Sequence, residues 1–239
     1  MGTYFLYSMT GFIMIPVFIF ALICQAKVKS NYKKYSKVMN SRGMTGAQAA
    51  YQLLMLNGVT DVTIQKISGN LTDHYDPTNK VINLSEGVFD SRSVAAVGIA
   101  CHEAGHACQH AQEYSFLKIR NAVIPATRIG SSLGIILCIG GIYLTTLASL
   151  STFGTFIAYV GIILYSFVVF FQLVTLPVEF DASKRALATI KGSNFLDQSE
   201  YKGAKKVLTA AALTYVAALA SALATLLRLV LLVSGGRRR

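Results

Sequence analysis

The sequence predicts a mainly α membrane protein with about four transmembrane helices and a small cytoplasmic α+β portion. Three observations predict this class: long apolar runs, basic residues gathered at their ends, and short helix and strand patterns between them. Each apolar run reaches the length of about 20 residues that crosses a bilayer. The runs are Tyr4–Ala26, Ile129–Leu150, Thr152–Leu176 and Val207–Val233, the last of which contains Arg228. In a chain of 239 residues, too little sequence remains to bury these runs in a soluble core, so we expect a multi-pass protein.

The first apolar run is expected to stay in the protein as an anchor. Its amino side, residues 1–3, has no basic residue, and no Ala-x-Ala site follows it cleanly. A secretory signal peptide has a basic amino side and ends at a site of that kind. We therefore do not expect this run to be cleaved.

The basic residues indicate which segments face the cytoplasm. The net charge is +11, and the Lys and Arg residues follow the first run, precede the second, and lie between the third and fourth. The bend at Ser149–Ser151 carries none. By the positive-inside rule, residues 27–128 and 177–206 are cytoplasmic. Basic residues next to membrane spans set the topology and contact lipid headgroups. Because the charge lies at these positions, no nucleic-acid partner is expected. The arginines at 237–239 then fall outside, against the rule, and the sequence leaves their side open.

The chain therefore divides into alternating membrane and cytoplasmic segments. The expected location is the plasma (inner) membrane, the lipid bilayer is an expected partner, and a homo-oligomer is not indicated. The segments are a transmembrane anchor at 1–26, a cytoplasmic segment with a small sheet and a histidine-bearing helix at 27–128, a transmembrane hairpin at 129–176, a second cytoplasmic segment at 177–206, and a transmembrane helix with a basic tail at 207–239.

The first cytoplasmic segment has the patterns of a helix, two strands and a second helix. Thr45–Leu56 has a helix pattern that ends at Asn57-Gly58. Val59–Ile67 is rich in β-branched residues, and Lys80–Leu84 is a second strand pattern. Ser91–Gln112 is rich in Ala, lacks Pro and has capping residues at its start. An edge strand of such a sheet could hold a peptide by main-chain pairing.

The most specific motif of the chain is His-Glu-Ala-Gly-His at residues 102–106. Positions i and i+4 of a helix share a face, so His102 and His106 can offer two imidazoles to one Zn²⁺. Glu103 lies beside them and is free to act as general base on a metal-bound water. The alternative is a coincidental pair of histidines on a helix.

A third protein ligand is required, because catalytic zinc normally takes three protein groups and a water. His110 is not expected, since a helix drifts by about 40° over four residues. Cys101 and Cys108 each lie about 100° or more around the helix from both imidazoles. A carboxylate is the better candidate, and Glu179 follows the third apolar run, where Pro177 is expected in the first turn of a new helix. Alternatively, Glu179 is a helix-start carboxylate stabilised by the helix dipole.

His74 stands in a polar cluster with Asp73, Tyr75 and Asp76. It is either a loop histidine bonded to a neighbouring carboxylate or a residue that contacts substrate or an oxyanion. Tyr75 and Arg185 are further candidates for stabilising an oxyanion. The sequence does not choose among the three.

Three segments carry a resemblance to a known family: His-Glu-Ala-Gly-His at 102–106, Glu-Phe-Asp-Ala-Ser at 179–183 and Leu-Thr-Asp-His-Tyr-Asp-Pro at 71–77. Through them the chain resembles the YugP-like membrane zinc metallopeptidases over nearly its whole length. More distantly, it is similar to the HtpX and CAAX-prenyl-protease gluzincins. The resemblance implies a gluzincin-like zinc endopeptidase that acts on membrane or membrane-associated proteins, with one Zn²⁺ per chain. It further implies that the metal ligands are His102, His106 and Glu179 and that Glu103 is the general base.

The chain departs from the more distant relatives four residues after Glu179, where they have Asp and this chain has Ser183. The nearest acid, Asp181, is expected on another face of the helix. The task of orienting a ligand imidazole therefore falls to Ser183 with a water, to Asp181, or to a residue elsewhere.

Two other classes of function compete with a peptidase. One is a non-catalytic membrane scaffold stabilised by zinc, which Glu103 argues against because a structural site does not need that carboxylate. The other is a transporter, which is disfavoured because no apolar run carries an interior acidic residue of the kind that transport pathways use.

Overall fold

The structure, a computed structural model, describes residues 10–236. These residues are mostly helical, and the mainly α class with four candidate spans and a small sheet is confirmed. The first predicted run begins at Tyr4, so its first residues lie outside the described part of the chain. The orientation of the spans across the membrane stays a prediction. The helices long and apolar enough to cross a bilayer are Thr10–Tyr35, Ser115–Leu144, Ala148–Gly192 and Gln198–Gly235.

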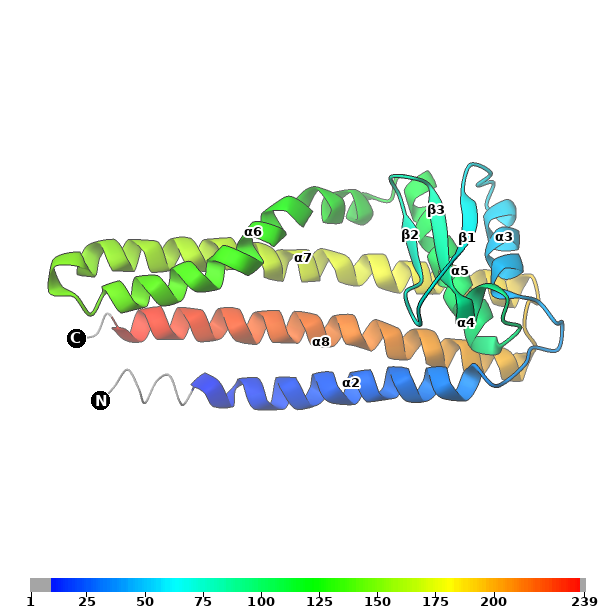
Figure 1. Ribbon diagram of the computed structural model, residues 1–239, viewed down its shortest axis with the longest axis horizontal. Helices are drawn as coiled ribbons and strands as arrows, with labels where there is room; N and C mark the ends of the chain where they lie inside the picture. The colour runs from blue at the N-terminus through cyan, green and yellow to red at the C-terminus, as the bar shows by residue number, and fades with distance from the viewer. Residues whose placement is uncertain (1–9, 237–239) are drawn as a thin grey trace. The chain divides into compact units, whose positions relative to one another are not determined.

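The described residues form two compact units. The first contains the described parts of Met1–Ile23, Lys118–Thr175 and Tyr215–Arg239, and the second contains Cys24–Leu117 and Leu176–Thr214. Figure 1 labels the helices and strands along the chain. They are α2 (Met14–Tyr35), α3 (Gly46–Leu56), β1 (Thr63–Ile67), β2 (His74–Asp76), β3 (Val81–Ser85), α4 (Glu86–Phe89), α5 (Val94–Ala111), α6 (Ser115–Leu144), a 3₁₀ helix (Ala148–Leu150), α7 (Ser151–Gly192) and α8 (Gln198–Gly236).

In the first unit, α6 and α7 approach one another at glycines. A Cβ built at Gly141 would collide with the backbone of Ala158, and one at Gly161 with the backbone of Cys138. Small residues at a contact let two helix backbones come close, which is a common way for helices to associate in a bilayer. The turn between these helices contains the 3₁₀ helix Ala148–Leu150, at the bend that the sequence predicts.

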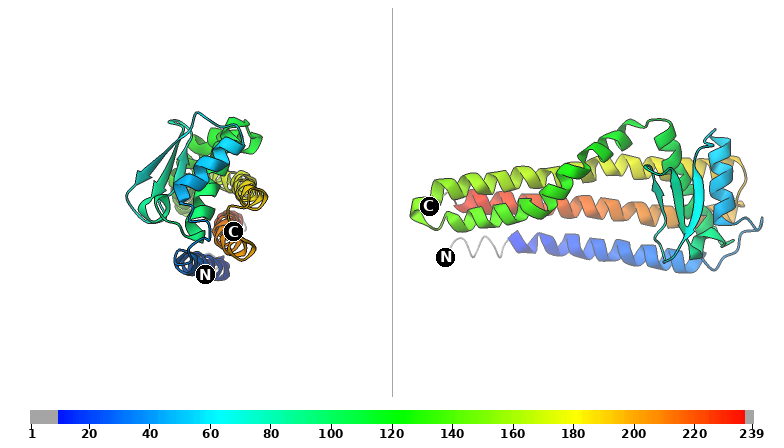
Figure 2. Two further views of the ribbon diagram at one scale, coloured as in Figure 1. Left: turned by 90° about the vertical axis from the view of Figure 1, so that its right-hand side faces the viewer. Right: turned by 45° about the horizontal axis from the view of Figure 1, so that its top comes forward.

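The second unit contains a three-stranded sheet in the order β1-β3-β2. Strand β3, predicted at Lys80–Leu84 and shifted by one residue, is parallel to β1 and antiparallel to β2. Its residues Ile82 and Leu84 are fully buried in the core of this unit. Helix α5 contacts α3 and the strands β2 and β3 (Figure 2). The sheet and α3 therefore fix the helix that carries the histidine motif.

Local sequence signals set the starts of α3 and α5. The Thr45 hydroxyl accepts a hydrogen bond from the Gln48 backbone, and the Gln48 side chain accepts one from the Thr45 backbone. This reciprocal pair is a capping box. At the start of α5, the Ser93 hydroxyl accepts a hydrogen bond of 3.1 Å from the backbone N–H of Ala96. Both helices begin close to the predicted positions.

Two predictions about the strands are wrong in detail. The strand expected at Val59–Ile67 is reduced to Thr63–Ile67, because the backbone N–H of Val59 still bonds to Leu54 of α3 at 2.9 Å. Strand β2, at His74–Asp76, lies where the sequence predicts a loop. It forms by pairing with β3, and such pairing depends on context that a local pattern does not reveal.

Helix α7 also differs from the prediction. The sequence predicts a new helix at Pro177, but α7 runs unbroken from Ser151 to Gly192 with Pro177 inside it. Proline removes one backbone donor, and membrane helices tolerate this where neighbouring groups compensate. Glu179 therefore lies in the interior of a helix, and its interpretation as a helix-start carboxylate is wrong.

Candidate metal centre

Three side chains that can bind a metal come together in the second unit, two from α5 and one from α7. Glu179 Oε2 lies 3.3 Å from His102 Nε2 and 3.5 Å from His106 Nε2. The three ligand atoms all lie within 4.8 Å of one another. The side chains are between 6% and 14% exposed. Two imidazole nitrogens and one carboxylate oxygen are a donor set that Zn²⁺ accepts, with a further position left for water.

Gly105, inside the histidine motif, allows α5 and α7 to come this close. A Cβ at Gly105 would lie 2.7 Å from the carbonyl oxygen of Ala182, a separation that real Cβ atoms essentially never show. Ala104, Ala182 and Ala186 are all fully buried. These small residues bring the histidines of one helix within reach of Glu179 on the other.

A buried amide holds the other ring nitrogen of His106. His106 Nδ1 lies 3.0 Å from Gln109 Oε1, and Gln109 is fully buried. Gln109 Nε2 donates to the carbonyl oxygen of Val178 and to Asp181 Oδ2, each at 2.8 Å. Because these two acceptors fix the amide nitrogen, the amide oxygen faces His106 and can only accept. His106 therefore carries a proton on Nδ1, which leaves Nε2, the nitrogen that faces Glu179, as the atom that would bind a metal.

The other ring nitrogen of His102 has a different partner. Ser183 Oγ lies 3.1 Å from His102 Nδ1. Asp181 accepts hydrogen bonds from Gln109 and from Arg185 Nε, the latter at 2.6 Å. Ser183 therefore contacts His102 directly, and Asp181 is linked to His106 through Gln109.

The charge around the three ligands favours a cation. Glu103 is 9% exposed, and its carboxylate makes no hydrogen bond within residues 10–236. Burial lowers the pKa of His106, but the hydrogen bond and charge of Glu179 and the charge of Glu103 outweigh it, so this pKa is raised above its usual range. The same negative potential attracts a divalent cation. Donor chemistry, tautomer and charge therefore all fit zinc.

His74 lies on β2 and is exposed. Its Nδ1 is 2.8 Å from the carbonyl oxygen of Thr72, and its Nε2 is 3.1 Å from Asn83 Nδ2. Its partners are thus a carbonyl group and an amide, and not the neighbouring carboxylate that the simpler interpretation expects.

Tyr75 reaches from β2 to α5, where its hydroxyl lies 2.8 Å from His110 Nδ1. Burial raises the pKa of Tyr75 to about 12, with smaller contributions from nearby charges, so the hydroxyl keeps its proton and can donate. His110 does not belong to the group of three possible metal ligands. This agrees with its expected position around the helix, turned away from His102 and His106. Arg185 pairs with Asp181, and its guanidinium lies 5.9 Å from the centre of the Tyr114 ring.

Cys101 and Cys108 are both buried. Burial raises the pKa of both thiols, that of Cys108 to about 11. A thiol that keeps its proton is a weak ligand, and neither residue belongs to the metal-ligand group found among the described residues.

The sequence alone does not predict the roles of Gln109 and Gly105 at this site. Zinc is bound by Cys, His, Asp and Glu side chains, so the neutral amide of Gln109 is not a candidate in a search for zinc ligands. Its spacing of three residues from His106 is a usable signal, because positions i and i+3 are neighbours on a helix surface. Gly105 gives no local signal, since its role depends on Ala182 in a distant helix.

Comparisons with known proteins identify the family of the chain. A model of the family described as "Putative neutral zinc metallopeptidase" matches residues 10–234. The chain is 48% identical over 213 residues to the "Putative membrane protease YugP" of Bacillus subtilis (strain 168). The aligned residues cover 89% of this chain and 91% of that protein. No solved structure matches the chain. The match over nearly the whole length shows that the chain belongs to the family described as "Putative neutral zinc metallopeptidase".

Proposed function

We propose that the protein is an integral-membrane zinc endopeptidase that hydrolyses peptide bonds of membrane or membrane-associated proteins at the cytoplasmic face. The observation that carries this proposal is the group of His102, His106 and Glu179, together with the Glu103 carboxylate, which is close enough to His106 to raise its pKa. The family and the four candidate spans support it. The two histidines and Glu179 would hold one Zn²⁺ per chain in a gluzincin-like site.

Glu103 is the proposed general base. When bound, zinc supplies a Lewis acid that polarises the scissile carbonyl and makes water more acidic. The Glu103 carboxylate accepts a proton from the attacking water and later delivers it to the leaving amine nitrogen. Its oxygens are available for this because no hydrogen bond within residues 10–236 engages them. A purely structural zinc site has no use for such a carboxylate, which disfavours the scaffold alternative.

Gln109 and Ser183 are proposed to hold the two ligand imidazoles in place. Each contacts the Nδ1 atom of one histidine, which leaves Nε2 for the metal. A partner on the second nitrogen fixes the tautomer and the orientation of a ligand histidine. Asp181 contributes by holding the Gln109 amide in the required direction.

Strand β2 is proposed to bind the backbone of the substrate. It pairs with β3 along one edge, and the order β1-β3-β2 leaves its other edge without a strand in the described sheet. An extended peptide can add to such an edge through main-chain hydrogen bonds. Strand β2 also contacts α5, the helix that carries the histidine motif.

Three side chains are candidates for stabilising negative charge on the carbonyl oxygen in the transition state: His74, Tyr75 and Arg185. Tyr75 keeps its proton at neutral pH and can donate a hydrogen bond. Arg185 carries a permanent charge but is ion-paired with Asp181. Each of the three would exchange a present partner for the substrate.

The experiment that tests the proposal is casein hydrolysis by the purified protein after reconstitution with zinc. We expect the wild-type protein to degrade casein and Glu103→Gln to fail, although both bind zinc. Zinc binding without hydrolysis in either protein would favour the non-catalytic scaffold.

A further inference from the structure

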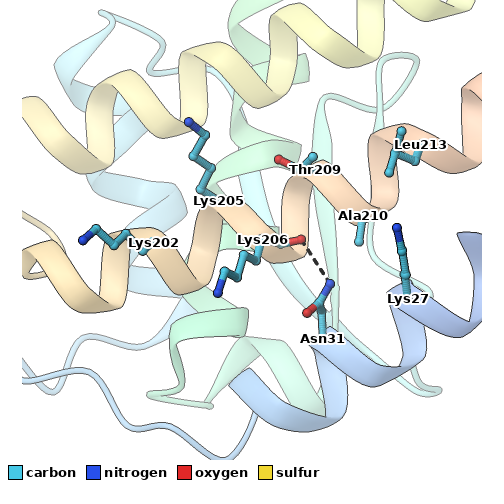
Figure 3. Close-up of a pocket in the computed structure, with 8 residues that line it drawn as sticks. All are labelled: Lys27, Asn31, Lys202, Lys205, Lys206, Thr209, Ala210 and Leu213. Carbon is cyan, nitrogen blue, oxygen red and sulfur yellow. Dashed lines mark hydrogen bonds between the residues drawn. The ribbon is translucent and has the colours of Figure 1, made fainter.

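We propose that a pocket between α2 and α8, within the second unit, binds the headgroup of an anionic phospholipid. The pocket has a volume of about 680 Å³. Lysines supply most of its polar lining: Lys27 comes from α2, and Lys202, Lys205 and Lys206 come from α8 (Figure 3). This proposal does not depend on the peptidase activity.

The positive charge of this pocket is not balanced by a carboxylate among residues 10–236. No carboxylate lines it, and none of the four lysines forms an ion pair within the described part of the chain. All four side chains are exposed. An ammonium group has three donors and no acceptor, so such a cluster favours an anion with several acceptor oxygens. A phosphate group has this chemistry.

Asn31 connects the two walls of the pocket. Its Nδ2 atom donates to the backbone oxygen of Lys206 at 3.4 Å (Figure 3). An amide nitrogen has two hydrogens, so the second can donate to an oxygen of a bound phosphate. The pocket therefore offers a neutral donor as well as cationic ones.

An apolar end distinguishes this pocket from a site for free phosphate. Ala210 is buried and Leu213 is half-buried, and both follow the lysines along α8. On α2, Lys27 comes directly after the charge-free run that ends at Ala26. A phospholipid presents the same order of groups, a phosphate followed by acyl chains. Basic pockets between membrane helices bind anionic headgroups, so a lipid fits both ends of this pocket.

The same lysines could act only as a topology signal, and a comparison within the chain separates the two roles. Lys29 and Lys33 are also exposed on α2 but do not line the pocket. General attraction to a charged bilayer would treat both sets alike. A headgroup site would depend on the pocket lysines alone.

The test uses the full-length protein in nanodiscs of defined lipid. The chain contains no Trp, so Thr209→Trp places a single fluorophore in the lining of the pocket. We expect phosphatidylglycerol with brominated acyl chains to quench this Trp more strongly than brominated phosphatidylcholine at the same fraction. In Phe156→Trp, at an exposed position outside the pocket, the two lipids should quench equally.

Paired lysine substitutions then locate the preference. Lys27→Gln with Lys206→Gln should lower the preference for phosphatidylglycerol by about tenfold or more. Lys29→Gln with Lys33→Gln removes the same charge and should leave the preference within about twofold. Lys27→Gln alone repeats the test if the double variant loses its helical circular dichroism.

Three results would overturn the proposal. The first is equal quenching of the Thr209→Trp protein by the two lipids. The second is an equal loss of preference in both lysine pairs, which would indicate general attraction. The third is removal of the preference by millimolar inorganic phosphate, which would indicate a site for the free anion.

Discussion

His106 and Gln109 form a hydrogen bond of 3.0 Å between the imidazole Nδ1 and the amide Oε1. The amide is held in one orientation because its nitrogen also donates to Val178 and Asp181. This hydrogen bond therefore decides which nitrogen of His106 is available to a metal. A buried neutral residue, one turn beyond the motif, thus shapes the metal centre.

Gln109→Ala should weaken zinc binding by about 10- to 100-fold, the usual effect of removing the partner of a metal-bound histidine. His106 Nδ1 loses its acceptor, and the ring is no longer held toward Glu179. Competition with a chelator measures the Kd for zinc. Gln52→Ala, at an exposed position of α3, is the control and should leave the Kd unchanged. The same Kd in Gln109→Ala and in the wild type would mean that this hydrogen bond does not position the ligand.

Gly105→Ala should lower the free energy of unfolding by about 1–3 kcal/mol, the range for overpacking, and should also lower zinc occupancy. The added methyl group would meet the carbonyl oxygen of Ala182, which forces α5 and α7 apart. Gly140 of α6 has nothing within 4 Å of a built Cβ, so Gly140→Ala should be neutral or stabilising. Thermal unfolding and zinc content per chain are the measurements. If the two variants behave alike, close contact at Gly105 is not needed for the site.

Glu179→Ala should lose both zinc and activity, because it removes one of the three proposed ligands. His110→Ala should keep both, because His110 lies outside the ligand group and loses only its bond to Tyr75. Zinc content by elemental analysis, together with casein hydrolysis, checks both variants. Full zinc occupancy in Glu179→Ala would direct the search for the third ligand to His74 and Asp181.

Ser68 and Ser193 should be labelled from the cytoplasmic side when each is replaced by Cys. Both positions are exposed, and the four natural cysteines are buried, which keeps the background low. The positive-inside distribution predicts that both segments face the cytoplasm. Membrane-impermeant thiol reagents on intact cells and on inverted vesicles make the measurement. Labelling of both sites from outside would contradict the proposed orientation, and labelling on opposite sides would contradict the topology.

The apolar spans and the histidine pair could be predicted because their signals are local. A run of apolar residues, or two histidines on one helix face, is visible in a short stretch of sequence. The structure brings Glu179 close to the two histidines. The sequence indicates Glu179 as the third ligand largely through a family resemblance.

The remaining features depend on partners that are distant in the sequence. Strand β2 exists because Tyr75 pairs opposite Ile82, and Gly105 matters because of Ala182. Pro177 gives a helix-start signal locally, but α7 continues through it. In each case the structure depends on tertiary contacts, which the local sequence pattern does not contain.

The central claim is that Glu103 performs chemistry and does not hold the metal. Glu103→Gln keeps nearly the same shape but cannot accept a proton from water. The most direct measurement is the rate of casein hydrolysis by zinc-loaded wild-type and Glu103→Gln proteins, with zinc content determined on the same samples. We expect the rate to fall by about 10²- to 10⁴-fold, the typical contribution of a general base, while the zinc content stays at the wild-type value. Hydrolysis at the wild-type rate by zinc-loaded Glu103→Gln would contradict the account.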